Sequence, residues 1–594
     1  MSPPAPVATS ARSDDAAPAA SPLRTESAAR RALVVVACAA ASALACALYS
    51  HVGRVSFALG WVALVPWLAA VDRGRSLAGA IAAGLAMSVG FALAVFGWLA
   101  DGIGAYTGAS PATSYAVLAA LAPILEPQLV ALAAARFALR RAREEEPTFS
   151  LRREAVAAVG GALAYVAVEW AWPKPLGDSL GHGFIASRVL RQGADLAGAG
   201  GLVLVLVLAN GFAVGALRAA LARRTRAAFA LAAAPAAAVA LLWLYGEWRL
   251  AALDARARGL PPGSSITAAL VQSDVASYGP LAAEVGTYEA VRRILDAHFA
   301  LSADAIASTG GIDLLVWPET VYPTTFGAPK SPDGGAFDRE IERFAAASGI
   351  PLVFGAYDVD AGTEYNAAFF LAPASDEPAR RLDLDAYRKR ALFPLTESVP
   401  SFLDRDDVRA AWPWLGTWKP GDGPAVVSVR LAGGRTIRIA PLICYDAVQP
   451  AFGRAAARER AQLFVTLSND SWFATGAGPL QHLVVAAFRS IETHRPQLRA
   501  TTTGISAVID ETGEIVASAP VHERATVIAP VAIGNGDGPW TLFVALGDWL
   551  GPVSALACTG LLVGAALARS RARPRSVAVG APRVRARSGR PRSR

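Results

Sequence analysis

The chain has 594 residues, too many for one hydrophobic core of ordinary size, so at least two structural units are expected. It is 54% hydrophobic and only 18% charged, and this composition argues against a simple soluble protein and for a membrane protein. The net charge of +8 does not indicate nucleic-acid binding, because the arginines crowd the termini and the short loops between apolar runs, as membrane orientation requires.

A disordered leader is predicted over residues 1–30, which are rich in Ala, Ser and Pro and carry no apolar periodicity. A transmembrane domain of about seven helices is predicted over residues 31–247, because apolar runs of about 20 residues can cross a hydrocarbon core. An eighth run predicts a C-terminal transmembrane helix at 541–568, before an Arg-rich cytoplasmic tail at 569–594. The first seven runs, of which the second is short, lie at roughly 31–49, 56–71, 77–100, 112–135, 154–172, 196–217 and 227–247.

The loops between these runs predict how the chain lies in the membrane. Arginines concentrate in the loops that share a side with the N-terminus, at 72–76, 136–153 and 218–226. The opposite loop at 101–114 has no Lys or Arg, so the N-terminus is predicted to be cytoplasmic and residues 248–540 to lie outside. An alternative makes the first run a cleaved signal peptide with Ala45-Cys46-Ala47 as its cleavage site, but the loop charges would then fit poorly.

Residues 260–535 alternate short β-rich runs with helical patterns, which predicts an α/β layered domain. This region has neither a phosphate-binding Gly-rich loop nor a zinc-like cysteine spacing, so no cofactor and no metal are expected. Strands are predicted at 266–275, 312–317, 351–357, 365–371, 436–444, 463–467, 497–502, 506–509, 515–519 and 526–531. Helices are predicted at 287–308, 335–347, 451–460 and 480–493.

Three polar residues end or follow apolar strands of this domain, where ligands bind in open α/β sheets. They are Glu319, Lys389 and Cys444, and Cys444 is the one cysteine outside the long apolar runs. A carboxylate can take the proton of a thiol, and a lysine can stabilise an oxyanion, so the three residue types suit acyl transfer. Each also has a simpler interpretation, namely a helix cap for Glu319, a solvated charge cluster for Lys389 and a buried small hydrophobe for Cys444.

Four segments together resemble the nitrilase superfamily, whose members use a Glu-Lys-Cys triad in an αββα sandwich. VWPET carries Glu319, YRK carries Lys389, LICYD carries Cys444, and NDSWF at 469–473 resembles a further strand-end motif. A nitrilase domain after about seven spans and before one more is the layout of the apolipoprotein N-acyltransferase family, to which Glu169-Trp170 is also similar. The resemblance covers roughly residues 30–568 and implies a polytopic helical membrane domain with an extracytoplasmic nitrilase-like domain.

The resemblance implies an N-acyltransferase of the bacterial inner membrane, with its catalytic domain on the periplasmic side. A phospholipid would acylate Cys444, and a diacylglyceryl-cysteine lipoprotein would then accept the acyl group in a ping-pong reaction. Catalytic roles are expected for Glu319, Lys389 and Cys444, and supporting roles for the Glu397 carboxylate and the Tyr445 backbone N–H. Asp446 stands where the family usually has Glu, and its role is left open. The alternative is a membrane-tethered nitrilase-like amidase, in which water resolves the thioester.

Overall fold

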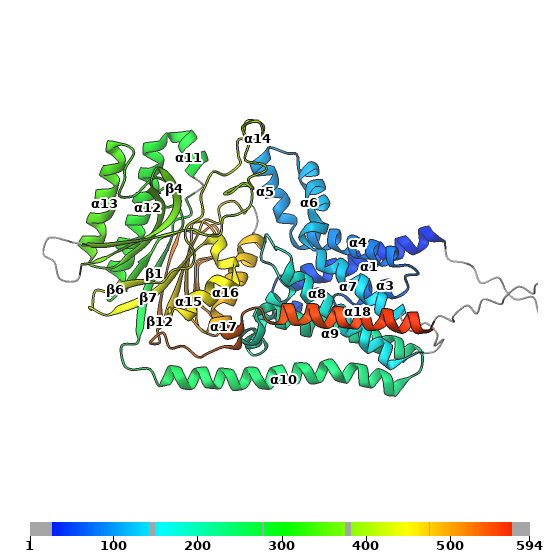
Figure 1. The fold of residues 1–594 in the computed structure, drawn as a ribbon. Helices are drawn as coiled ribbons and strands as arrows, with labels where there is room; N and C mark the ends of the chain where they lie inside the picture. The colour runs from blue at the N-terminus through cyan, green and yellow to red at the C-terminus, as the bar shows by residue number, and fades with distance from the viewer. Residues whose placement is uncertain (1–26, 142–148, 276–277, 375–381, 474–475, 573–594) are drawn as a thin grey trace, which may run out of the picture.

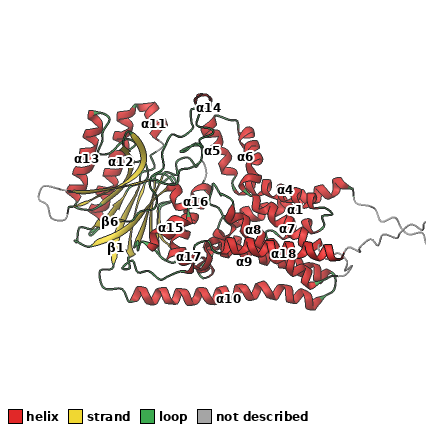
Figure 2. Cartoon of the chain, viewed as in Figure 1, coloured by secondary structure: helices red, strands yellow, loops and turns green. Residues whose placement is uncertain are grey.

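The computed structural model describes residues 27–141, 149–275, 278–374, 382–473 and 476–572, so most of the predicted leader and tail lie outside the described residues. All the strands lie in one half of the molecule, together with the helices that cover them, and the other half is helical (Figures 1 and 2). The helical half is built from α1 (Ala28–Tyr49), α2 (Arg54–Gly60), α3 (Val65–Asp72), α4 (Leu77–Val95), α5 (Gly97–Thr107), α6 (Pro111–Leu125), α7 (Pro127–Arg141), α8 (Leu151–Ala171), η1 (Leu180–Ala186), η2 (Leu190–Gly193), α9 (Ala194–Leu221), α10 (Thr225–Arg258) and α18 (Leu550–Ala572).

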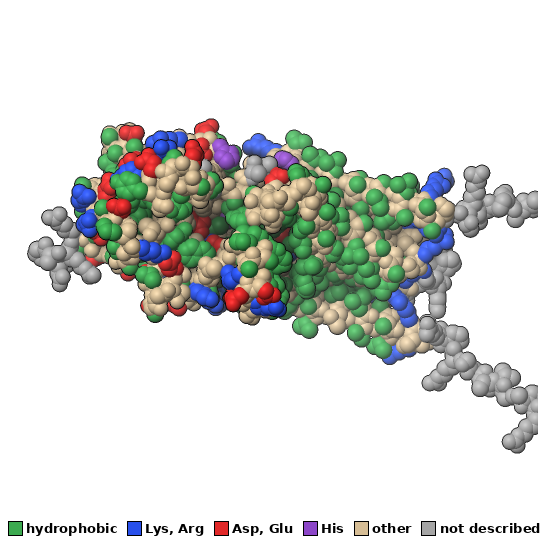
Figure 3. All heavy atoms as spheres, turned by 90° about the horizontal axis from the view of Figure 1, so that it is seen from above, with side chains coloured by type: hydrophobic (Ala, Val, Ile, Leu, Met, Phe, Trp, Pro, Cys, Tyr) green, Lys and Arg blue, Asp and Glu red, His purple; other side chains and the backbone are tan. Residues whose placement is uncertain are grey.

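The helical half is a multi-pass membrane domain. Among the described residues, seven helical stretches are long and apolar enough to cross a membrane, and the pair α5 and α6, bent by 120°, would make an eighth. Figure 3 shows mostly apolar and uncharged side chains over this half, with Lys and Arg gathered at the end farthest from the sheets. Charged side chains of both signs lie over the other half of the same face. This distribution suits a helical bundle in lipid that carries a domain in water.

The predicted fourth span at 112–135 is wrong in its bounds, because the chain breaks inside it. Glu126, with φ −126° and ψ 50°, separates α6 from α7. Pro127 follows it, and a residue before proline is disfavoured in the helical region. The predicted loop at 101–114 is also mostly helical, since α5 continues to Thr107 and ends at Gly108 in the left-handed region.

The first helix belongs to the core of the membrane domain. Tyr49 at its end is buried and donates a hydrogen bond to the Leu180 carbonyl at 3.0 Å. Cys46, one turn earlier, is also buried. These contacts favour a permanent span over the alternative of a cleaved signal peptide.

The second half is an α/β domain, as the sequence predicted. It is a sandwich of two six-stranded sheets. Their orders are β12-β1-β2-β3-β4-β5 and β11-β10-β9-β8-β7-β6. In each sheet three neighbouring strands, β1-β2-β3 and β7-β8-β9, are parallel, and the flanking strands are antiparallel. The strands are β1 (Ser265–Gln272), β2 (Leu314–Val316), β3 (Leu352–Asp360), β4 (Thr363–Pro373), β5 (Leu382–Arg388), β6 (Val427–Arg430), β7 (Thr436–Ile443), β8 (Leu463–Ser468), β9 (Gln497–Thr501), β10 (Ala507–Ile509), β11 (Ile515–Ser518) and β12 (Ala525–Ala532).

The two sheets pack face to face through an apolar core to which both contribute, for example Leu270 and Val316 from one and Ile439 and Val465 from the other. Helices cover the outer faces (Figure 1), which gives the predicted αββα arrangement. They are α11 (Tyr278–Val285), α12 (Thr287–Ser308) and α13 (Pro332–Ser348) on one side, and α15 (Pro450–Arg458) and α16 (Ala477–Thr493) on the other, with α14 (Asp406–Ala411) and α17 (Leu542–Leu546) in the connections.

The membrane domain and the sandwich share one apolar core and several polar contacts. Apolar side chains of α16, such as Phe488, lie in the same buried cluster as those of the membrane helices. Asp195 at the start of α9 is fully buried and accepts hydrogen bonds from Tyr245 of α10 at 2.6 Å and from His494, just after α16, at 3.0 Å. The sandwich is therefore held against one end of the helical bundle, which fixes its strand ends relative to the membrane helices.

Candidate active site

Glu319 lies directly beyond the carboxyl end of β2, after Trp317 and Pro318. It is buried, with 4% of its surface exposed. The turn that carries it lies against Gly355 of β3, where an added Cβ would come within 2.4 Å of the Thr320 backbone nitrogen. A glycine at this position therefore lets the Glu319 turn lie directly on the neighbouring strand.

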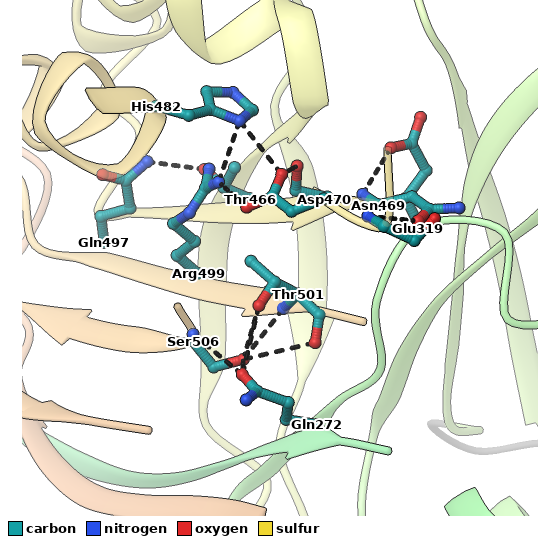
Figure 4. A network of polar contacts seen from close by, with 12 residues as sticks. Gln272, Glu319, Thr466, Asn469, Asp470, His482, Gln497, Arg499, Thr501 and Ser506 are labelled. Atoms are coloured by element: carbon teal, nitrogen blue, oxygen red, sulfur yellow. Dashed lines mark hydrogen bonds and ion pairs between the residues drawn. The ribbon is translucent and has the colours of Figure 1, made fainter. Parts of the chain in front are cut away.

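The Glu319 carboxylate is held by three donors from three segments. Oε1 accepts from Asn366 Nδ2 at 2.7 Å and from Lys389 Nζ at 3.1 Å. Oε2 accepts from the Asn469 backbone N–H at 2.8 Å, a contact visible in Figure 4. Asn469 follows β8, so the carboxylate spans the ends of both sheets. Its position is fixed by charge-assisted hydrogen bonds rather than by packing alone.

Lys389 follows β5 and is 1% exposed. Its Nζ donates to Glu319 and to Glu397 Oε1, the latter at 2.6 Å. Burial alone would lower the pKa of Lys389, but the nearby Glu319 and Glu397 carboxylates and the Cys444 sulfur raise it well above its ordinary value. Glu397 is itself held by the Phe393 backbone N–H at 2.7 Å. The lysine is thus a fixed positive charge at neutral pH.

Cys444 lies at the junction between β7 and the short 3-10 helix η3 (Cys444–Val448). Its φ is +47°, in the left-handed region that non-glycine residues rarely adopt. Burial and the Glu319 carboxylate raise the pKa of the Cys444 thiol, while Lys389 acts in the opposite direction. The resting sulfur is therefore a thiol, so a nucleophilic role for it needs a base that takes the proton during attack.

Asp446 joins the Cys444 turn to the Lys389 segment. It is fully buried and accepts hydrogen bonds from the Ile443 backbone N–H at 3.0 Å, the Tyr387 hydroxyl at 3.0 Å and the Ala391 backbone N–H at 2.7 Å. Tyr387 and Ala391 lie on either side of Lys389 in the chain. Burial raises the pKa of Asp446 to about 6. The residue whose role the sequence left open is therefore a structural link between the cysteine and the lysine.

A second buried polar network supports the strand end that carries Asn469 (Figure 4). Asp470 accepts from Arg499 Nη2 at 2.9 Å and from Ser468 Oγ at 2.7 Å, and it lies 3.1 Å from His482 Nδ1. Burial alone would raise the pKa of Asp470, but Arg499 and His482 hold it below its ordinary value. An ionised Asp470 keeps the loop after β8 in place, and with it the N–H that binds Glu319.

Cys444 opens onto an apolar cavity of about 110 Å³ between the two domains. The sandwich contributes Tyr445, Phe393 and Trp472, and the membrane domain contributes side chains from α1, α4, α5 and the segment 175–183. Trp98 of α5 contacts Phe473 with ring centroids 5.0 Å apart, which closes one wall with aromatic rings. The cavity is lined by Cys444 and by apolar side chains of the membrane helices, which suits a substrate with a hydrocarbon chain.

The geometry brings all the sequence-predicted site residues into one region. Lys389 contacts Glu319 and Glu397 directly, and Cys444 with its neighbour Tyr445 lies within electrostatic range of these charges. Asn366 was not among the predicted site residues, although it is a polar residue at the start of the apolar stretch NAAFFL. The membrane-domain side of the cavity was not predicted either, because no local sequence signal marks it.

Two families match the chain in succession. Residues 40–212 match the family described as apolipoprotein N-acyltransferase N-terminal domain, and residues 267–535 match the family described as carbon-nitrogen hydrolase. An apolipoprotein N-acyltransferase of Bdellovibrio bacteriovorus is 29% identical over 69% of this chain and 73% of its own length. One of Pseudomonas putida is 30% identical over 56% of this chain, and the aligned part spans 60% of that relative.

Solved structures that include members of the nitrilase superfamily are similar to part of the chain. A Saccharomyces cerevisiae member of that superfamily is 19% identical, with a TM-score of 0.33, over 47% of this chain and 92% of its own. An amidase from Nesterenkonia sp. is 21% identical, with a TM-score of 0.32, over 47% of this chain and 94% of its own.

Proposed function

We propose that this chain, which carries both domains of the apolipoprotein N-acyltransferase family, transfers a fatty acyl group from a membrane phospholipid to a lipoprotein. The acceptor is the α-amine of an N-terminal diacylglyceryl-cysteine. The observation that carries the proposal is the Glu319–Lys389 pair beside Cys444, at the end of an apolar cavity that reaches the membrane helices. A soluble amidase has no use for such a cavity, whereas an enzyme with two lipid substrates needs one.

In the first half-reaction Glu319 takes the proton of the Cys444 thiol as the sulfur attacks the carbonyl carbon of the phospholipid ester. Glu319 is a suitable base because Asn366 and Asn469 hold its carboxylate in a fixed position. Lys389 and the Tyr445 backbone N–H stabilise the oxyanion of the tetrahedral intermediate. The ester C–O bond then breaks, and the lysophospholipid alkoxide leaves with the proton that Glu319 returns. Cys444 remains as an acyl thioester.

In the second half-reaction the neutral α-amine of the acceptor attacks the thioester carbonyl. The same two donors stabilise the oxyanion, and Glu319 takes a proton from the attacking nitrogen. The C–S bond breaks, the thiolate recovers its proton, and an amide-linked acyl chain leaves on the lipoprotein. Because Lys389 stays charged throughout, one oxyanion site serves both halves of the ping-pong cycle.

The membrane arrangement belongs to the same proposal. The N-terminus lies in the cytoplasm, the helices cross the bacterial inner membrane, and the sandwich over residues 260–535 lies on the periplasmic side. Support comes from the arginines in the predicted cytoplasmic loops and from the Lys and Arg side chains at the end of the bundle farthest from the sheets (Figure 3). In this orientation the cavity at Cys444 opens at the level of the outer leaflet, where both substrates are anchored.

Intact mass measurement tests the covalent step. Incubation with phospholipid is expected to add one acyl group, which hydroxylamine removes and which the Cys444→Ala variant lacks. Addition of a diacylated lipopeptide is then expected to give the triacylated product and the free enzyme. Absence of the adduct would contradict the thioester mechanism. Release of free fatty acid without triacylated product would instead favour the membrane-tethered hydrolase.

A further inference from the structure

A second cavity lies at the end of η3, the short helix that begins at Cys444. Its volume is about 290 Å³, and it lies between the end of α8, the segment 172–179, the start of α9, the end of η3, α16 and the start of α18. Four residues line both cavities: Asp178, Ser179, His182 and Val448. Val448 is the last residue of η3, the helix that Cys444 begins. The two cavities therefore adjoin across one turn of the catalytic segment.

The second cavity differs from the first in being lined by charged groups. Four carboxylates and two cationic side chains line the second cavity, so the formal charge of its lining is negative. Lys174 is already bound to Asp178 at 2.8 Å and to the buried Glu126 at 3.0 Å. Arg489 is 1% exposed and bound to Glu492 at 2.9 Å. The carboxylates in excess of these pairs are Glu169 and Asp548.

Several buried polar atoms on this lining lack a partner among the residues that the structure describes. They are Glu169 Oε1 on α8, Glu492 Oε2 on α16, and Nε and Nη1 of Arg489. Burial raises the pKa of Glu492 to about 8, so its carboxyl group is ionised at neutral pH only when a bound cation favours the charged form. Buried carboxylate and guanidinium atoms without a hydrogen-bond partner are costly, and a ligand that both donates and accepts hydrogen bonds would satisfy them. A primary ammonium offers three donors, and an oxygen beside it would accept from Arg489.

We infer that this second cavity binds a primary ammonium group with a neighbouring oxygen acceptor, belonging to one of the two lipid substrates. The inference rests on the proposed function, because it assigns the polar end of a substrate whose acyl chemistry takes place at Cys444. Both substrates can supply this chemistry. The acceptor has an α-amine next to a carbonyl group, and a phospholipid with an aminoethyl headgroup has an ammonium next to a phosphate.

The test removes one carboxylate charge at a time. The variants are Glu169→Gln and Glu492→Gln, which keep the size of the side chain, and the matched control is Glu154→Gln. Glu154 is a buried carboxylate on the same helix as Glu169. It lies about 22 Å along the helix axis from Glu169, by the rise per residue of an α-helix. The control therefore reports the general cost of neutralising a buried carboxylate in α8.

The two half-reactions are measured separately with the full-length protein. Thioester formation is followed with two phospholipids that have the same acyl chains, one with an aminoethyl headgroup and one with a glycerol headgroup. Thioester consumption is followed with a diacylated lipopeptide. Loss of a charge-assisted contact is expected to raise one half-saturating concentration about tenfold relative to Glu154→Gln. A rise confined to the aminoethyl phospholipid assigns the site to the donor, and a rise confined to the lipopeptide assigns it to the acceptor.

The inference is overturned if half-saturating concentrations in Glu169→Gln and Glu492→Gln equal those of the control for all three substrates. Equal losses with both phospholipids would also overturn it, because the headgroup ammonium would then play no part. Failure of the proposed function looks different, since the unmodified protein would then form no thioester at all. In that case the substrate assignment of the second cavity falls with it.

Discussion

Two of the buried ion clusters among the described residues invite comparison, and of these two only one lies beside a cysteine. In the membrane domain, Arg136 makes a two-pronged contact with Asp72, both distances being 2.8 Å, and Arg140 contacts Glu154 at 3.2 Å. In the sandwich, Lys389 contacts Glu319 and Glu397. Asp72 and Glu154 have no exposed side-chain surface, and Lys389 has 1%. Burial and ion pairing alone therefore do not distinguish a structural cluster from a catalytic one.

The difference lies in the cation and in what surrounds it. Arginine binds carboxylates through a planar fork and keeps its charge, which suits a fixed joint between α3 and α7. Lysine presents a compact charge with three donors, so a third partner such as an oxyanion can share Lys389. The sandwich cluster also lies beside Cys444 and its cavity. A buried ion pair acquires a candidate chemical role when a reactive group and space for substrate lie next to it.

The largest expected effect is that of Cys444→Ala, because it removes the reacting atom and leaves the ion pair intact. Acyl transfer is expected to fall by about four orders of magnitude or more, and the hydroxylamine-sensitive mass adduct to disappear. Cys558→Ala is the control, since Cys558 is a buried cysteine in α18. Transfer that survives in Cys444→Ala, or an adduct lost in Cys558→Ala, would show that the nucleophile has been assigned wrongly.

Paired substitutions of the two cations test the comparison itself. Lys389→Met is expected to lower the rate of acyl transfer about 10²- to 10³-fold through loss of the oxyanion partner. Its effect on stability should be smaller, because Glu319 keeps its hydrogen bonds from Asn366 and Asn469.

Arg136→Met should behave in the opposite way. It leaves Asp72 as a buried charge with fewer partners, which typically costs about 3–5 kcal/mol of stability, while transfer per folded molecule is unchanged. Thermal unfolding in detergent and transfer assays on the folded fraction measure the two effects. If both variants lose activity equally at equal stability, the distinction between the clusters is wrong.

Glu319 and Cys444 were predictable because each follows a clear apolar strand signal, whereas Lys389 follows β5, which was not predicted as a strand. LLVWPE and APLICYD combine a β-rich run with a single reactive residue, and the resemblance to a family connects them. The fold class followed from the alternation of strand and helix patterns. Strands β5 and β6 were missed, since LDLDAYR contains two aspartates, which strands disfavour, and VSVR is short for a strand.

The contacts that complete the site depend on three-dimensional register, which a linear pattern does not contain. Asn366 reaches Glu319 because β4 pairs with β3 and β5, and 47 residues separate the two. The break at Glu126 was not predicted because an apolar run with one internal Glu-Pro step still has the mean hydropathy of a single span. The aromatic wall of the cavity brings together Trp98 and Phe473, which no sequence window contains.

A smaller effect is expected from substitution of Asp446, which joins the Cys444 turn to the Lys389 segment. Asp446→Asn keeps the side-chain size but cannot accept from Ile443, Tyr387 and Ala391 as a carboxylate does. We expect a fall in kcat of about 10- to 100-fold, with the half-saturating concentration of phospholipid unchanged. Asp446→Glu should restore part of the rate, because it returns the charge in the residue that the family usually has. An unchanged kcat in Asp446→Asn would show that Asp446 does not support the site.

A further effect is a pH dependence of stability, which separates Asp446 from an ordinary surface carboxylate. Burial raises its pKa to about 6 in the folded protein, whereas an unfolded aspartate has a pKa of about 4. Between these values the folded state holds more of the proton, so the stability contributed by this group falls as pH rises from about 4 to 6. Two pKa units correspond to about 3 kcal/mol.

Relative to Asp446→Asn, which cannot ionise, the unmodified protein should therefore lose stability between about pH 4 and 6 and show a constant difference in stability above about pH 7. Thermal unfolding of both proteins from pH 4 to 8 measures that difference. A difference that stays flat from pH 4 to 6 would mean that Asp446 keeps an ordinary pKa in the folded protein, and that its three donors fully offset the cost of burying its charge.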